Sequence, residues 1–149
     1  KTASVMTYCS VAPAVLASSS PKVISLCRDF GWHLGLAFQL MDDTLDLSGQ
    51  SQKDLLLDLK NGVVNSVIYE WLLFNPAIHQ KYKNGESLEK LWDKNGIKEA
   101  ISLVQERGQN HLVQARNALV EIQRETPIKV KDALVPLENI IRYLGKRDS

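Results

Sequence analysis

Residues 38–46 read FQLMDDTLD, and this stretch decides how the chain is interpreted. It closes a long apolar segment with three carboxylates in five residues. Since a helix advances by about 100° per residue, Asp42, Asp46 and Asp43 are expected at roughly 0°, 40° and 100° on one stripe. Like charges that close repel one another, so a compensating cation would stabilise them. Carboxylate oxygens suit Mg²⁺, which binds through one or two carboxylates plus substrate phosphates. The competing interpretation is an acidic turn at a solvated helix end.

Helical patterns follow one another along the chain, and no β-type alternation competes with them. Glycine, proline and Asn-Gly pairs separate them, as is typical of helix ends. Short loops between helices imply antiparallel neighbours in a bundle, so the sequence predicts an all-α fold. The expected helices cover residues 1–17 (kinked at Pro13), 22–47, 53–59, 63–74, 76–83, 87–94, 97–107, 109–124 and 130–144, with Gly108 breaking or bending the chain.

Composition excludes several classes of protein. The 149 residues carry a formal net charge of +1, which gives no reason to expect DNA or RNA as a partner. The sequence shows no Rossmann, Walker or zinc-ligand spacing, and no apolar run approaches the roughly 18 residues of a membrane span.

Cys9 and Cys27 lie in apolar helical patterns without a CxxC arrangement. They are expected to be buried free thiols, with a disulfide between them as the minor alternative.

The residues around the aspartates extend the pattern. Gly31, Gly35 and Ala37 precede Phe38-Gln39, the run Asp58-Leu59-Lys60-Asn61-Gly62 follows, and the chain opens on Lys1-Thr2. This order of motifs resembles the trans-isoprenyl diphosphate synthases, or polyprenyl synthetases. Their second aspartate-rich motif has the form G-x-x-x-G-x-A-F-Q-x-x-D-D-x-x-D, and the sequence fits it at every specified position.

The resemblance implies a helical bundle of the isoprenoid-synthase type. It covers nearly the whole chain, so residues 1–149 are expected to be the C-terminal half of such a domain, a partial domain. The first aspartate-rich motif of the family is expected ahead of Lys1. The alternative is a naturally short subunit of a heteromeric synthase.

The resemblance also implies a reaction and its residues. Isopentenyl diphosphate would condense with an allylic diphosphate to make a longer prenyl diphosphate, with Mg²⁺ as the cofactor. Asp42, Asp43 and Asp46 would bind the metal, and Asp42, Asp43 and Lys1 would be catalytic. The substrate-binding residues would be Lys1, Thr2, Phe38, Gln39 and Lys60. The competing roles are core packing for Phe38, a buried amide hydrogen-bonded to backbone for Gln39, and a solvated terminus for Lys1. His33 and Trp32 are expected to be packing residues.

The sequence departs from the family pattern after the DL-x-x-G element. Many members carry a lysine directly after its glycine, where this chain has Val63. Some long-chain synthases have Thr and Pro a little further on, where this chain has Asn65 and Val67. Asn65 can still cap the next helix, whereas Asp58 is expected to be a helix-terminal charge.

Two interpretations from different classes compete with the enzyme. One is a non-catalytic partner subunit of a heteromeric prenyl diphosphate synthase, and the other is an unrelated helical bundle with an acidic patch. Retention of Asp42, Asp43, Asp46 and Gln39 favours the enzyme, because a purely structural subunit does not need such charge repulsion.

The family resemblance implies a homodimer or a heteromer in the cytoplasm or an organelle, including the mitochondrion. No targeting segment is visible.

Overall fold

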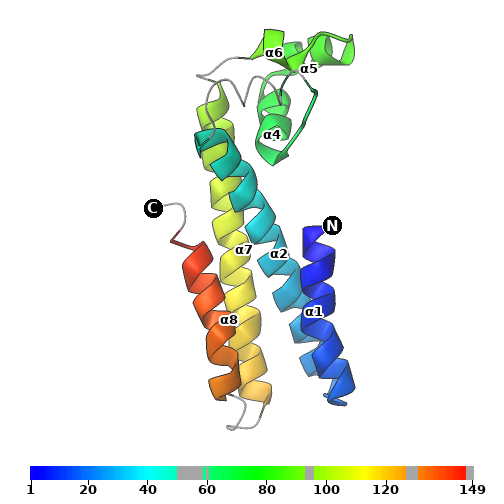
Figure 1. The fold of residues 1–149 in the computed structure, drawn as a ribbon, viewed down its shortest axis with the longest axis vertical. Helices are drawn as coiled ribbons and strands as arrows, with labels where there is room; N and C mark the ends of the chain where they lie inside the picture. Colours follow the sequence, from blue (N-terminus) through cyan, green and yellow to red (C-terminus); the bar gives the residue numbers. More distant parts are fainter. Residues whose placement is uncertain (50–58, 60, 93–95, 127–130, 147–149) are drawn as a thin grey trace. The chain divides into compact units, whose positions relative to one another are not determined.

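The computed structural model describes residues 1–49, 59, 61–92, 96–126 and 131–146. All the regular structure in these ranges is helical, which confirms the predicted all-α class. The helices fall into two compact units, Lys1–Met41 with Arg107–Ser149, and Asp42–Glu106. The helices are α1 (Thr2–Leu16), α2 (Pro21–Gly49), α4 (Ser66–Phe74), α5 (Pro76–Lys83), α6 (Leu88–Leu91), α7 (Ile97–Glu125) and α8 (Lys131–Leu144) (Figure 1). Both α2 and α7 contribute residues to each unit.

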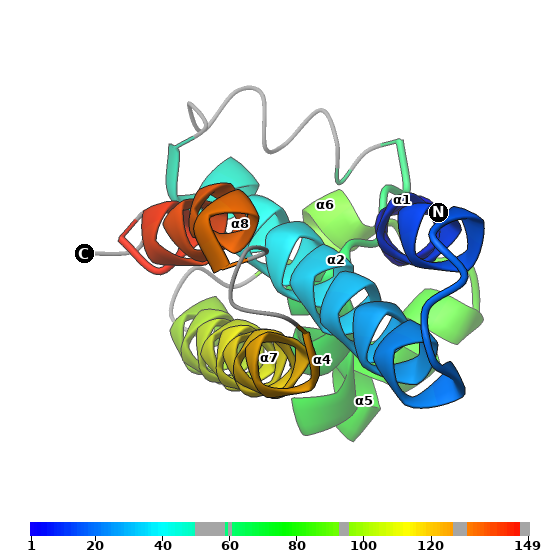
Figure 2. The same ribbon diagram turned by 90° about the horizontal axis from the view of Figure 1, so that it is seen from below.

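In the first unit, one apolar core joins α2, α7 and α8. Phe30, Leu34 and Met41 of α2 are buried there with Leu119 of α7 and Ile141 of α8. Viewed in two directions, α1 lies on one side of α2, and α7 and α8 lie on the other (Figures 1 and 2). Burial of such side chains is the main favourable term in helix packing.

The first two glycines of the predicted motif explain how closely α1 approaches α2. A Cβ atom on Gly35 would lie 2.5 Å from the Cα atom of Ala3, and one on Gly31 would lie 2.6 Å from the carbonyl oxygen of Met6. Both distances are far below van der Waals contact, and the neighbouring atoms belong to the backbone. Only glycine therefore permits this packing of α1.

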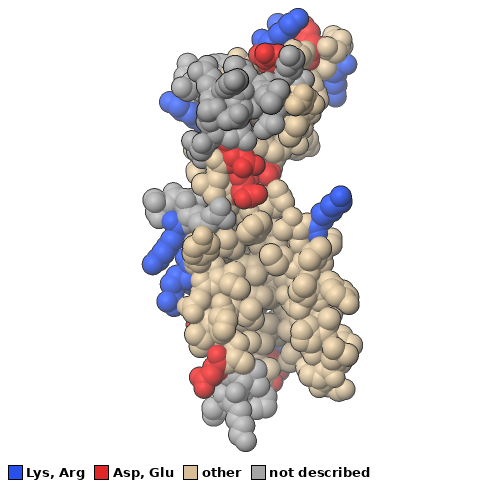
Figure 3. Space-filling view, viewed as in Figure 1, with Lys and Arg blue, Asp and Glu red and all other residues tan. Residues whose placement is uncertain are grey.

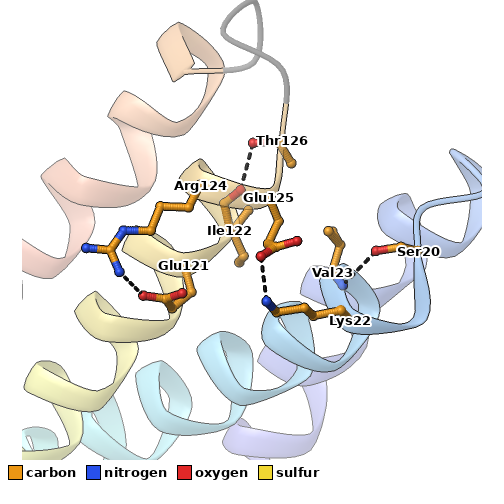
Figure 4. A network of polar contacts seen from close by, with 8 residues as sticks. All are labelled: Ser20, Lys22, Val23, Glu121, Ile122, Arg124, Glu125 and Thr126. Atoms are coloured by element: carbon orange, nitrogen blue, oxygen red, sulfur yellow. Dashed lines mark hydrogen bonds and ion pairs between the residues drawn. The ribbon is translucent and has the colours of Figure 1, made fainter.

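Polar contacts join the start of α2 to the end of α7 (Figure 4). Lys22 Nζ lies 2.5 Å from Glu125 Oε1, and this hydrogen bond raises the pKa of the exposed Lys22 above its usual range. Ser20 Oγ accepts a hydrogen bond from the Val23 backbone at 3.3 Å. Helix α2 thus begins at Pro21, one residue before its predicted start at residue 22.

Two predictions for the first unit are wrong. Gly108 was expected to break or bend the chain, but α7 continues through it. Gly108 is buried, and a Cβ atom there would lie 3.4 Å from Met41 Cγ, so helix packing offsets its low helix propensity. Cys9 and Cys27 are free thiols as expected, but Cys9 is exposed. Cys27 is half-buried, and burial raises the pKa of its thiol.

In the second unit, helix α4 begins later than predicted. The expected start at Val63 is wrong because Asn65 is the N-cap, with its side chain accepting a hydrogen bond from the Ile68 backbone at 3.0 Å. The predicted turn is confirmed by the positive φ of 70° at Gly62. α5 matches its predicted span, whereas α6 is only four residues long and ends before Trp92. The expected helix over residues 53–59 lies almost wholly outside the described residues.

Candidate functional site

Four of the predicted site residues lie in the first unit. Thr2 starts α1, and its hydroxyl donates a hydrogen bond of 2.8 Å to Gln39 Oε1 on α2. The close packing at Gly35 brings these two helices together there. Lys1 and Gln39 are exposed. Phe38 is half-buried and packs against the apolar core, which agrees with the competing packing role.

The three predicted metal ligands belong to the second unit and differ in their surroundings. Asp46 is exposed and Asp42 is partly exposed, whereas Asp43 is buried, with only 9% of its surface accessible. Among the residues that the structure describes, no three His, Cys, Asp or Glu side chains are grouped so as to hold a metal ion. The three carboxylates therefore do not form a complete metal cage of their own. Mg²⁺ does not require one, because it commonly binds through one or two carboxylates together with substrate phosphates and water.

Asp43 meets the beginning of α4. Its Oδ2 accepts hydrogen bonds from the backbone N–H of Ser66 at 2.9 Å and from the Ser66 hydroxyl at 2.6 Å. Asn65 adds a third contact, because its Nδ2 donates to the Asp43 carbonyl oxygen at 3.3 Å. Ser66 was not among the site residues predicted from the sequence. The signal that could have found it is the Asn-Ser pair before an apolar run, which is typical of a helix N-terminus.

The DL-x-x-G element is only partly described. Leu59 is buried and Gly62 forms a left-handed turn, a conformation that favours glycine. Val63, which replaces the family lysine, is half exposed. Lys60, the predicted substrate-binding residue, and Asp58 both lie outside the described residues.

A separate polar cavity lies between α2 and α7 in the first unit. It has a volume of about 400 Å³, and its lining includes Asp29, His33, Asn117 and Glu121 but none of the predicted site residues. At its edge, the Nδ1 atoms of His33 and His111 are 2.9 Å apart. His33 therefore packs against another ring, consistent with the expected packing role.

Comparison with known proteins agrees with the motif on α2. A family model described as polyprenyl synthetase matches residues 1–104. This chain belongs to the polyprenyl synthetase family. Relatives of this chain include solanesyl-diphosphate synthase 1, mitochondrial, from Oryza sativa subsp. japonica, with 30% identity over 92% of this chain and 34% of the relative.

Two further relatives extend the comparison. Hexaprenyl pyrophosphate synthase, mitochondrial, from Saccharomyces cerevisiae is 35% identical over 81% of this chain and 28% of its own length. Farnesyl diphosphate synthase from Bacillus subtilis is 42% identical over 36% of this chain and 18% of its own length. The chain thus spans about a third of the length of the first two relatives. No helix among the described residues is long and apolar enough to cross a membrane.

Proposed function

We propose that the protein containing this chain is a trans-prenyltransferase that condenses isopentenyl diphosphate with an allylic diphosphate. The proposal is carried by the family match over residues 1–104, which includes the complete aspartate motif of α2. The relatives named above as solanesyl, hexaprenyl and farnesyl diphosphate synthases support this reaction class.

In the proposed reaction, the allylic C–O bond breaks and its electron pair leaves with diphosphate. The remaining allylic cation is attacked by the double bond of isopentenyl diphosphate, which forms the new C–C bond. Loss of a proton then restores a double bond and gives an allylic diphosphate that is one isoprene unit longer. Exclusion of water protects the cation from capture.

The accessible carboxylates of Asp42 and Asp46 fit the hard oxygen donors that Mg²⁺ prefers. When bound, Mg²⁺ would stabilise the negative charge that develops on the departing diphosphate. Asp43 is the third carboxylate of the proposed set, but it is buried and hydrogen-bonded to Ser66. We therefore place most of the proposed metal binding on Asp42 and Asp46.

The other residues proposed to bind substrate are four residues of the first unit and Lys60. Lys1 would contact the allylic diphosphate as a cation, and the hydrogen bond from Thr2 holds the Gln39 amide beside the start of α1. Gln39 would line the diphosphate site, and Phe38 would line the site for isopentenyl diphosphate. Lys60 would add a second basic contact to diphosphate.

The decisive experiment uses Asp42→Ala in the full-length protein, with Asp29→Ala on the same helix as the control. Turnover is measured as incorporation of labelled isopentenyl diphosphate with Mg²⁺ and an allylic diphosphate. Asp42→Ala should lower turnover by about 10²-fold or more, since it removes charge stabilisation used in the transition state. Helical circular dichroism should stay unchanged. Normal turnover in Asp42→Ala would refute the metal role, and an inactive wild-type protein would favour the partner-subunit interpretation.

We infer that the protein works as a homodimer or as part of a heteromeric synthase. Helix α1 contains no charged residue, yet Val5, Tyr8 and Leu16 are 60%, 74% and 85% exposed. In Figure 3, uncharged side chains cover most of the α1 face in view. Large apolar patches of this kind are typical of protein interfaces.

The proposed location is the cytoplasm or an organelle, and the two eukaryotic relatives described above carry mitochondrial names.

A further inference from the structure

Asp43 is bound on two sides at the start of α4. Its carboxylate accepts two hydrogen bonds from Ser66, and its carbonyl oxygen accepts one from Asn65. Asn65 in turn caps α4 by accepting a hydrogen bond from Ile68. Two of the backbone N–H groups that a helix leaves unpaired at its start are therefore bound by the side chains of Asp43 and Asn65.

Burial makes these contacts energetically important. Asp43 is 9% exposed and the adjacent Thr44 is 1% exposed, and a carboxylate removed from water needs hydrogen-bond partners. A bond of 2.6 Å between the Ser66 hydroxyl and Asp43 has the length of a charge-assisted hydrogen bond. The positive end of the α4 dipole adds a favourable interaction with the same carboxylate. Asp43 is therefore held by α4, whereas Asp42 and Asp46 are more accessible.

We propose that Asp43 is a positioning residue, which fastens the start of α4 and the preceding turn to the last turns of α2. The inference rests on the proposed function, and it assigns different roles to the three aspartates of the motif. Asp42 and Asp46 bind the metal, and Asp43 fixes the segment that runs from Gly62 to Ser66. In the sequence this segment begins two residues after Lys60, the proposed diphosphate contact, so its order matters for substrate binding.

The test compares Asp43→Asn and Ser66→Ala in the full-length protein, with turnover measured across a Mg²⁺ titration. Asparagine keeps an oxygen that can accept from Ser66, but without the negative charge that bond is weaker, and an amide is a poor metal ligand. Ser66→Ala removes the hydroxyl donor and leaves the carboxylate. Asp42→Asn serves as the control for loss of a metal ligand. Ser102→Ala, at an exposed serine of α7, is the control for the serine change.

Positioning predicts that Asp43→Asn and Ser66→Ala behave alike. Each should lower turnover by about three- to tenfold and raise the KM for allylic diphosphate, while the Mg²⁺ concentration for half-maximal turnover stays within about twofold of wild type. The double variant should lose no more than the worse single variant, because the two residues share one interaction. Asp42→Asn should instead raise the Mg²⁺ requirement at least about tenfold.

The opposite pattern would overturn the inference. Asp43→Asn would then raise the Mg²⁺ requirement as much as Asp42→Asn does, and Ser66→Ala would match Ser102→Ala. A second measurement separates this failure from failure of the proposed function. Hydrogen exchange of the Ser66–Glu70 amides should accelerate in Asp43→Ala and less in Asp43→Asn, whether or not the protein transfers prenyl groups. Unchanged exchange in Asp43→Ala would refute the contact itself.

Discussion

At the scale of single residues, His33 and His111 form the most unusual polar pair among the described side chains. Their Nδ1 atoms are 2.9 Å apart, so one ring must donate and the other must accept. Burial, followed by the charge of His33, lowers the pKa of His111. The folded protein therefore favours neutral His111.

This lowered pKa predicts acid sensitivity. Below about pH 6.5 the unfolded chain binds more protons at His111 than the folded chain does, so the free energy of unfolding falls as the pH falls. The loss levels off below the folded-state pKa of His111. Thermal denaturation of the full-length protein between pH 8 and pH 5 should show a larger drop in Tm for wild type than for His111→Gln. Parallel pH profiles for the two proteins would contradict the prediction.

The surroundings of the proposed site residues could be predicted only in part from the sequence. Thr2 and Gln39, both predicted to bind substrate, are hydrogen-bonded to each other, and their role in substrate binding stays a prediction. The direction of Asp43 could not be predicted, because its partner Ser66 is 23 residues away in the sequence and on another helix. Helical spacing predicts on which face of its own helix a side chain lies. It does not predict which residues of a neighbouring helix that side chain contacts.

At the scale of helices, two glycines on α2 and one on α7 have opposite consequences. Gly31 and Gly35 let the α1 backbone approach α2, where any Cβ atom would collide with it. Gly108 has ordinary contact distances to Met41. Glycine is therefore required at the first two positions and only tolerated at the third.

Alanine substitutions at Gly35 and Gly108 test this difference between required and tolerated glycine. Gly35→Ala should destabilise the protein by about 1–3 kcal/mol through overpacking against Ala3. Gly108→Ala is the matched control, and it should be neutral or stabilise by up to about 1 kcal/mol, because alanine has the higher helix propensity. Urea denaturation of the full-length variants measures both changes. Equal effects of the two substitutions would show that the α1–α2 approach is not the limiting contact.

At the scale of the whole molecule, the uncharged surface of α1 marks the proposed subunit interface. In the full-length protein, Val5→Lys together with Tyr8→Lys should lower the mass measured by light scattering towards that of one subunit, since buried charges oppose association. Val113→Lys on α7 is the control, because Val113 is also a half-exposed apolar residue. An unchanged mass in the double variant would remove α1 from the interface.

Local sequence was sufficient for the all-α class, the family, and the limits of α1 and α5, because helix periodicity, caps and spaced motifs are properties of neighbouring residues. It failed at Gly108 and at the start of α4, where packing against Met41 and capping by Asn65 outweighed simple propensity. Tertiary structure alone separated buried Asp43 from the more accessible Asp42 and Asp46. The physical reason is that a buried carboxylate needs hydrogen-bond donors, and the donors for Asp43 come from α4.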